Sequence, residues 1–185
     1  QGGMKEYSET DALYKLNKAN VTVAGQEGGF LPLSNPYPAK LSVSKFLQGN
    51  AVNIQGQGVY KFNNSTQDFP MNPNGAGEID IAEGFFVKLV DGVSSIEFSQ
   101  TQLTAYQPTT SQKSAVEREF IELSLVQNNH ASKLYFAHNE QAEQEYDIFD
   151  ADKLFAMTEM TEPYFVTEGI ALVKEEVAEL PYYAT

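Results

Sequence analysis

Residues 84–98 read Gly-Phe-Phe-Val-Lys-Leu-Val-Asp-Gly-Val-Ser-Ser-Ile-Glu-Phe, and this stretch decides the fold class. Residues 84–90 are rich in aromatic and β-branched side chains, which favour strands. Asp91-Gly92 follows, and apolar and polar residues alternate again at 95–98. Because Asp-Gly is typical of the tight turn between two paired strands, the stretch predicts a β-hairpin.

Similar strand-like runs lie on both sides of this hairpin, separated by polar stretches. They cover residues 13–24, 58–62, 117–126, 132–137, 164–166 and 169–173. The runs 117–126 and 132–137 predict a second hairpin with its turn at 127–130, in which Ile121, Leu123 and Leu125 share one face. Ser8 and Asp11 leave open a helix in place of the strand at 13–24, because they resemble a helix-capping pair.

About eight short strands with turn signals between them favour an all-β, mainly antiparallel fold. We expect a β-sandwich with a jelly-roll-like arrangement and one or two short helices. The helices are predicted at 42–48, ending at Gly49-Asn50, and at 147–156. The proline-containing residues 35–38 predict a rigid, extended corner, and the polar residues 63–77 and 106–115 predict surface loops.

Length and composition limit the class of protein. A chain of 185 residues is expected to form one domain, here a piece of a longer multidomain protein with residues 1–27 as a peripheral N-terminal segment. The formal net charge of −13 repels phosphate backbones and anionic lipid, which argues against nucleic acid as a partner. The absence of cysteine excludes disulfides, cysteine zinc sites and thiol catalysis. No run of about 18 apolar residues predicts a membrane span.

Catalytic signatures are weak. Only His130 and His138 could act as bases near neutral pH, and no serine lies in a nucleophile-elbow context that would complete a Ser-His-Asp triad. The alternating acids Glu78, Asp80 and Glu83 leave open the carboxylate pair of a glycoside hydrolase, although alternating acids are also typical of the solvated face of a strand. We therefore expect a protein that is not an enzyme and has no catalytic residues and no cofactor.

The densest acidic cluster offers weak candidate metal ligands, Asp147, Asp150 and Asp152. Closely spaced aspartates suit calcium, which takes several oxygen ligands, but the spacing does not match an EF-hand loop. The favoured alternative is that Asp150 or Asp152 caps the short helix predicted around Leu154. Structural calcium is thus an open alternative and no more.

Tyrosines supply a candidate sugar-stacking surface, because their rings offer apolar faces with a polar rim. The tyrosines in question are Tyr60, Tyr106, Tyr135, Tyr146, Tyr164, Tyr182 and Tyr183. Strand residues that fill a core without tryptophan explain most of them equally well.

Four stretches occur in an order typical of a known family. They are Asn35-Pro36-Tyr37-Pro38, residues 81–88, residues 146–154, and the closing residues 170–181. Together they resemble the β-rich module found near the C-terminal end of large secreted surface proteins of the Bacteroidetes, upstream of a type IX secretion sorting domain. The chain departs from the family pattern at Glu83, where glutamine is usual, and at 98–101, which lacks an arginine and a histidine.

The resemblance implies an exported module at the extracellular or outer cell surface, with a structural, adhesive or glycan-binding use. Its motifs look architectural, since none contains a nucleophile or an acid–base pair. We therefore expect a non-catalytic structural or adhesive module, whose partners are neighbouring domains of the same polypeptide and a host protein or glycan. The alternative is a carbohydrate-binding module, and a glycoside hydrolase is the third reading.

Overall fold

The computed structural model describes residues 21–73, 75–105, 119–127, 130–155 and 161–179. Within these ranges the chain is mostly strands in antiparallel sheets with one α-helix and short 3-10 turns, which confirms the predicted all-β class. In chain order the elements are β1 (Val21–Ala24), β2 (Phe30–Ser34), β3 (Leu41–Ser42), α2 (Val43–Gly49), η1 (Gln55–Gln57), β4 (Val59–Tyr60), β5 (Met71–Asn72), β6 (Glu78–Ile79), β7 (Gly84–Lys88), β8 (Ser95–Phe98), η2 (Gln100–Gln102), β9 (Ile121–Gln127), β10 (His130–His138), β11 (Ala151–Asp152), β12 (Phe165–Thr167) and β13 (Ile170–Val177).

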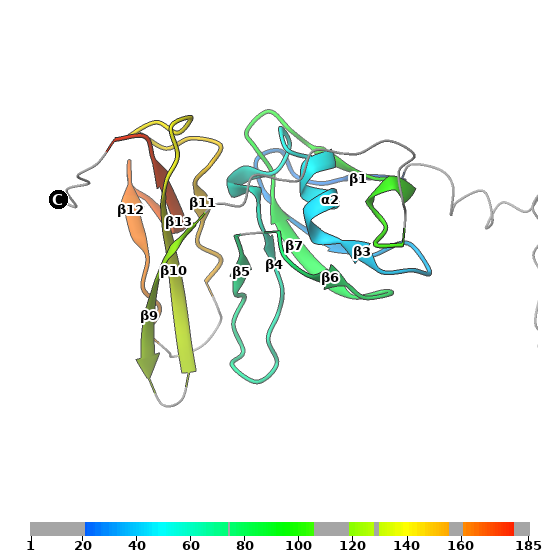
Figure 1. Cartoon of the computed structure of the whole chain (residues 1–185), viewed down its shortest axis with the longest axis horizontal. Coiled ribbons are helices and arrows are strands. Elements are labelled where there is room, and N and C mark those ends of the chain that lie inside the picture. The colour runs from blue at the N-terminus through cyan, green and yellow to red at the C-terminus, as the bar shows by residue number, and fades with distance from the viewer. Residues whose placement is uncertain (1–20, 74, 106–118, 128–129, 156–160, 180–185) are drawn as a thin grey trace, which may run out of the picture.

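The strands form two groups, which lie side by side in Figure 1. The first contains a four-stranded sheet with the order β2-β7-β4-β5, together with the two-stranded sheets β1-β8 and β3-β6. The second is a five-stranded sheet with the order β11-β13-β10-β9, in which β12 also pairs with β13. β10 and β13 run parallel, and the other pairs in both groups are antiparallel.

The first predicted hairpin is wrong in its pairing, although its turn is present. Gly92 has the positive φ of 84° that such a turn needs, and the Val93 amide donates to the Val90 carbonyl at 3.0 Å. However, β7 lies between β2 and β4, so both of its edges are occupied. β8 therefore pairs with β1 instead, with Val21 opposite Phe98.

The second predicted hairpin is confirmed. β10 pairs antiparallel with the whole of β9, from Ile121 opposite Phe136 to Gln127 opposite His130. A further hairpin joins β12 to β13, and its turn residues Glu168 and Gly169 both have positive φ. The turn residues 128–129, the loop 106–115 and the helix alternative that involves Ser8 and Asp11 lie outside the described residues.

The one α-helix in the described part of the chain begins at a local cap. α2 confirms the prediction at 42–48: the Ser42 hydroxyl accepts a hydrogen bond from the Lys45 amide at 3.4 Å, and Asn50 is the C-cap residue. The helix predicted at 147–156 is wrong, because its residues form turns and then β11, which pairs with β13. There the Asp147 side chain accepts hydrogen bonds from nearby backbone amides, which competes with helix formation.

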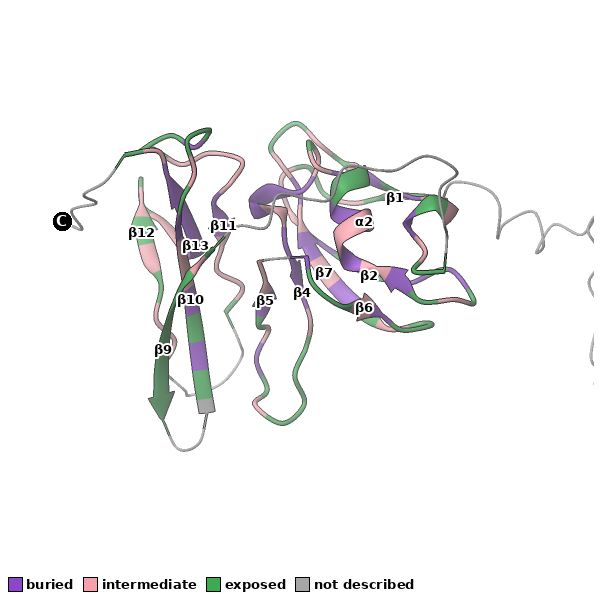
Figure 2. Cartoon of the chain, in the orientation of Figure 1, coloured by how far each residue is buried: buried purple, intermediate pink, exposed green. Residues whose placement is uncertain are grey.

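The core has two parts. The larger cluster lies within the first group of strands and includes Phe46, Phe85 and Phe98, which are almost completely buried and in ring contact. The smaller cluster joins the two groups, because it combines Tyr60 and Met71 from the first with residues of β10, β11 and β13 from the second. Figure 2 shows buried positions in strands on both sides of this junction, such as β4 and β13. Whether the two sheets form a jelly-roll-like sandwich stays a prediction.

Two segments that the sequence predicts to lie at the periphery contribute strands to the fold. Residues 63–77 include β5, whose Met71 is 3% exposed, because Phe69 and Met71 pack into the junction between the sheets. Within 1–27, residues 21–24 form β1, and Val21 and Val23 pack against the larger core cluster. No helix in the described part of the chain is long and apolar enough to cross a membrane.

Candidate functional site

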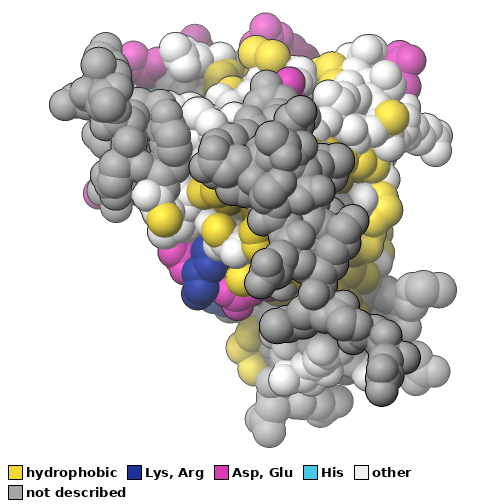
Figure 3. Space-filling model, turned by 90° about the vertical axis from the view of Figure 1, so that its right-hand side faces the viewer, with side chains coloured by type: hydrophobic (Ala, Val, Ile, Leu, Met, Phe, Trp, Pro, Cys, Tyr) yellow, Lys and Arg dark blue, Asp and Glu magenta, His cyan; other side chains and the backbone are white. Residues whose placement is uncertain are grey.

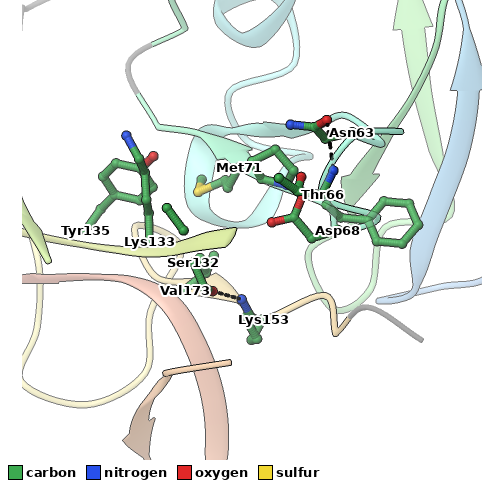
Figure 4. A pocket seen from close by; sticks show the side chains of 12 residues that line it. Asn63, Thr66, Asp68, Met71, Ser132, Lys133, Tyr135, Lys153 and Val173 are labelled. Atoms are coloured by element: carbon green, nitrogen blue, oxygen red, sulfur yellow. Dashed lines mark hydrogen bonds between the residues drawn. The ribbon is translucent and has the colours of Figure 1, made fainter. Parts of the chain in front are cut away.

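The candidate site is a pocket of about 270 Å³ between the two groups of strands. One wall is the β4–β5 connection, from Asn63 to Met71, and the other is β10 with Lys153 and Val173 (Figure 4). The full lining is Asn63, Thr66, Asp68, Phe69, Pro70, Met71, Ala131, Ser132, Lys133, Tyr135, Lys153 and Val173.

Local turn chemistry shapes the first wall. The Asn63 side-chain oxygen accepts hydrogen bonds from the backbone amides of Ser65 and Thr66, and the Asn63 amide donates to the Asp68 carbonyl at 2.9 Å. The Thr66 hydroxyl donates to an Asp68 carboxylate oxygen at 2.5 Å. These bonds hold the tip of the connection in a fixed shape, so that Thr66 and Asp68 line the pocket.

Lys153 lines the second wall of the pocket beside β10. Its side chain is only 7% exposed and its Nζ lies 2.8 Å from a carboxylate oxygen of Glu162, which is equally buried. The same Nζ donates to the Ser132 hydroxyl at 3.4 Å, as drawn in Figure 4. The positive charge of Lys153 is therefore neutralised inside the protein. Its ammonium group lines the pocket while held by the ion pair and the hydrogen bond.

Charge at the rim is balanced in the same way. Lys133 lies 2.8 Å from Glu122, with both side chains 42% exposed, and this pairing raises the pKa of Lys133. Burial raises the pKa of the nearby Tyr135, so its hydroxyl is neutral and available as a donor at physiological pH. The walls thus combine aromatic surface from Phe69 and Tyr135 with two ion-paired lysines and with polar groups that include the Asp68 carboxylate.

Ion pairs also occur on the surface outside the pocket. On the side of the molecule that lies to the right in Figure 1, the visible basic side chains gather at one place beside acidic side chains, with hydrophobic side chains elsewhere (Figure 3). Lys40 makes ion pairs of this kind with Glu78 and Asp80, both at 3.1 Å. This pairing raises the pKa of Lys40 and lowers that of Glu78.

The three candidate metal ligands have separate structural roles. Asp147 accepts amide hydrogen bonds from Phe149 and Glu143, both at 2.7 Å. Asp152 pairs with Lys88 at 2.9 Å and accepts the Tyr146 hydroxyl at 2.6 Å. Among the described residues no group of three or more histidine or acidic side chains is arranged to hold a metal ion.

Asp150 is the third candidate and is 1% exposed. Its carboxylate accepts hydrogen bonds from the backbone amides of Glu176 at 3.0 Å and Asp147 at 3.1 Å. It does not cap a helix as predicted, because it fixes a turn against β13 instead. Burial raises its pKa to about 7, more than these hydrogen bonds lower it.

The three acidic residues that the sequence offers for glycoside hydrolysis also form ion pairs with lysines. Glu78 and Asp80 both bind Lys40, and Glu83 binds Lys61 at 3.1 Å. A second Glu83 oxygen accepts the Asp80 amide at 2.7 Å, which fixes the turn before β7. None of the three lines the pocket.

The remaining sequence candidates do not converge either. His138 lies at the end of β10 with its Nε2 2.9 Å from the Ala178 carbonyl oxygen, and His130 begins the same strand. Of the four candidate tyrosines that the structure describes, only Tyr135 lines the pocket, whereas Tyr60 and Tyr146 bond to Asp152 at the junction between the sheets. Tyr164 stacks edge-on against Phe155. Tyr106, Tyr182 and Tyr183 lie outside the described residues.

Sequence reasoning missed most of the pocket, because four segments far apart in the chain form it. The residues Asn63, Thr66 and Asp68 fall in a stretch that its polarity assigns to a surface loop. One signal was present: the apolar run Phe69-Pro70-Met71 inside that stretch indicates that the loop returns to the core.

Comparison with known proteins does not identify a family for the chain. No family model matches the chain, and neither a curated protein nor a solved structure is detectably similar to it.

Proposed function

We propose that the chain is a non-catalytic adhesive module of a secreted or cell-surface bacterial protein, and that its pocket binds a sugar ring. One observation carries the proposal: the pocket joins aromatic walls to hydrogen-bonding groups, and both of its lysines are already ion-paired within the protein. The export of the module rests on the family resemblance alone.

The chemistry of the lining favours a neutral, polyhydroxylated ligand. A sugar ring has apolar C–H faces that stack on aromatic side chains and hydroxyls that both donate and accept hydrogen bonds. Phe69 and Tyr135 offer the aromatic surface, and Asp68, Ser132 and Tyr135 offer acceptors and donors. An anionic ligand is less well matched, because each pocket lysine already has a carboxylate partner within 2.8 Å.

The size of the pocket limits the ligand further. Sites for drug-sized molecules usually enclose about 300 to 1,000 Å³. A pocket of about 270 Å³ lies just below that range. It therefore suits one sugar unit, such as the end of a chain or a branch, better than a long oligosaccharide segment.

A non-catalytic role is favoured by where the carboxylates are. Glycoside hydrolysis needs two carboxyl groups on opposite sides of the bound sugar. Asp68 is the acidic residue that lines the pocket, and it is 7% exposed and hydrogen-bonded to Thr66. The arrangement supports binding without bond cleavage.

A glycan microarray tests the proposal. The wild-type chain is expected to bind at least one glycan above background, and Ala131→Phe is expected to abolish binding because the added ring fills the pocket. Val166→Phe is the matched control, since Val166 is exposed on another strand and does not line the pocket. Repeating the array with calcium and with a chelator tests the metal alternative at Asp147, Asp150 and Asp152.

Two outcomes contradict the proposal. Binding to no glycan under any condition removes the sugar-binding role, and equal binding by wild type and Ala131→Phe removes the pocket as its site. The location has its own test, because a full-length gene product that stays in the cytoplasm excludes a secreted module.

A further inference from the structure

β9 is an open edge of the second sheet. It lies at the end of the order β11-β13-β10-β9, and β10 is its only partner among the described strands. A strand in this position has one side of its backbone amides and carbonyls available to another chain.

The side chains of β9 are exposed from end to end, as Figure 2 shows. Ile121, Leu123 and Leu125 share one face and are 61%, 49% and 40% exposed, and Val126 on the other face is 67% exposed. Large apolar side chains gathered on one exposed strand are typical of a contact site rather than of a solvated surface.

The strand also lacks several of the features that protect open edges, although it carries one charged residue, Glu122. Its sequence, Ile-Glu-Leu-Ser-Leu-Val-Gln, has no proline and no lysine, and its register with β10 is unbroken from Ile121 to Gln127, so it has no bulge. Proteins usually carry one of these features on an exposed edge, because a flat apolar edge pairs readily with another strand.

Charge indicates what kind of chain pairs with it. The formal net charge is −13, and the exposed Glu119 lies just before the strand, whereas Glu122 within it is ion-paired with Lys133. A second copy of this chain would bring like charges together, which disfavours self-association. A basic partner gains from the same field, both in affinity and in association rate.

We propose that β9 is a docking edge for an extended, basic polypeptide segment. The segment adds a strand beside β9, places apolar side chains at alternate positions against Ile121, Leu123 and Leu125, and directs lysine or arginine toward the acidic surface. This inference is independent of the sugar pocket.

A synthetic peptide tests the docking edge. The probe has nine residues, with valine at even positions and lysine or threonine at odd positions, and the control peptide has the same composition without the alternation. We expect the probe to bind the wild-type chain with a dissociation constant below about 1 mM and the control to bind at least about tenfold more weakly. Bound probe should slow amide hydrogen exchange only in the segment that contains residues 121–127.

A pair of variants separates strand addition from simple charge attraction. Leu123→Glu with Leu125→Glu makes the edge more acidic but removes its apolar surface, so the proposal expects at least about tenfold weaker binding. Val166→Glu adds acid on another exposed strand and should leave binding unchanged or slightly stronger. Circular dichroism checks that the variants are folded.

Three results overturn the proposal. They are no binding of the probe, stronger binding by the double variant Leu123→Glu with Leu125→Glu, and a wild-type dimer in sedimentation that this double variant dissociates, which would make a second copy the occupant. Loss of sugar binding in Ala131→Phe leaves this proposal unaffected, so the two tests fail separately.

Discussion

Lys88 on β7 and Asp152 on β11 form an ion pair across the two groups of strands, with 2.9 Å between Nζ and Oδ2. The two side chains are 15% and 16% exposed. Asp152 also accepts hydrogen bonds from Tyr146 through its carboxylate and from Tyr60 through its carbonyl, both at 2.6 Å. Burial raises the pKa of both tyrosines, so their hydroxyls remain donors at any physiological pH.

Lys88→Met is expected to destabilise the protein by about 3 kcal/mol, because it leaves the mostly buried Asp152 carboxylate without its positive partner. The methionine keeps the apolar stem that packs near Phe30. Chemical denaturation measures the change. Lys133→Met is the control, since its ion pair is 42% exposed and should contribute less than about 1 kcal/mol. Equal losses in the two variants would show that the junction between the sheets does not depend on this pair.

Asp150→Asn is expected to remove a pH-dependent loss of stability. Burial raises the pKa of Asp150 to about 7 in the folded protein, whereas the pKa of an aspartate in the unfolded chain is about 3.8. The folded state therefore binds a proton that the unfolded state lacks between these values, and the free energy of unfolding falls as pH rises through that window. Asparagine does not titrate, so the variant gains stability relative to wild type from pH 4 to pH 7.

Urea denaturation between about pH 4 and pH 8 measures that difference, with Asp91→Asn, an exposed aspartate, as the control. As a substitution on the surface, the control should stay within about 0.5 kcal/mol of wild type. A constant gap between wild type and Asp150→Asn would mean that Asp150 is ionised in the folded protein throughout.

The sequence predicts those elements that local chemistry specifies. Ser42 caps α2 through its own hydroxyl, and the β9–β10 hairpin needs only alternating residues on either side of a polar turn. The hairpin around Asp91-Gly92 carries an equally clear local signal, and its pairing is wrong because β2 and β4 occupy both edges of β7. Which strand fills an edge depends on distant segments, and a local pattern does not contain that information.

The candidate site was less predictable for the same reason. Asp147, Asp150 and Asp152 are close in sequence and suggest a metal loop, but the fold directs each to a different partner. The pocket instead combines Thr66 with Lys153, which no sequence pattern links. Local spacing thus identified the acidic cluster and could not show that it connects the two sheets.

Asn35→Asp is expected to destabilise the protein by about 3 kcal/mol at neutral pH. The Asn35 side chain is 4% exposed, and its amide group donates to the carbonyls of Ala39, Ile79 and Asp80 at 2.8–3.2 Å. A carboxylate of the same shape would face these oxygens with no donor. The loss should shrink on acidification, because a protonated carboxyl regains one donor. Asn64→Asp, on the exposed surface, should leave thermal unfolding almost unchanged and serves as the control.

Gly56→Ala tests whether close backbone approach holds the two sheets together. Gly56 has a φ of 68°, and an added Cβ would lie 2.3 Å from the Cβ and 2.6 Å from the Cα of Ala151 on β11. Gly92 has a φ of 84° with nothing within 4 Å, so Gly92→Ala reports the cost of the left-handed backbone alone, about 1 kcal/mol. Ala151 cannot move away easily, because the backbone of β11 is paired with β13. Gly56→Ala should therefore lower the free energy of unfolding by at least about 1 kcal/mol more than Gly92→Ala does, as measured by chemical denaturation. Similar losses would mean that η1 moves away from β11 without consequence, and the junction would then depend on the side-chain contacts of Lys88 and Tyr60 rather than on packing of the backbone.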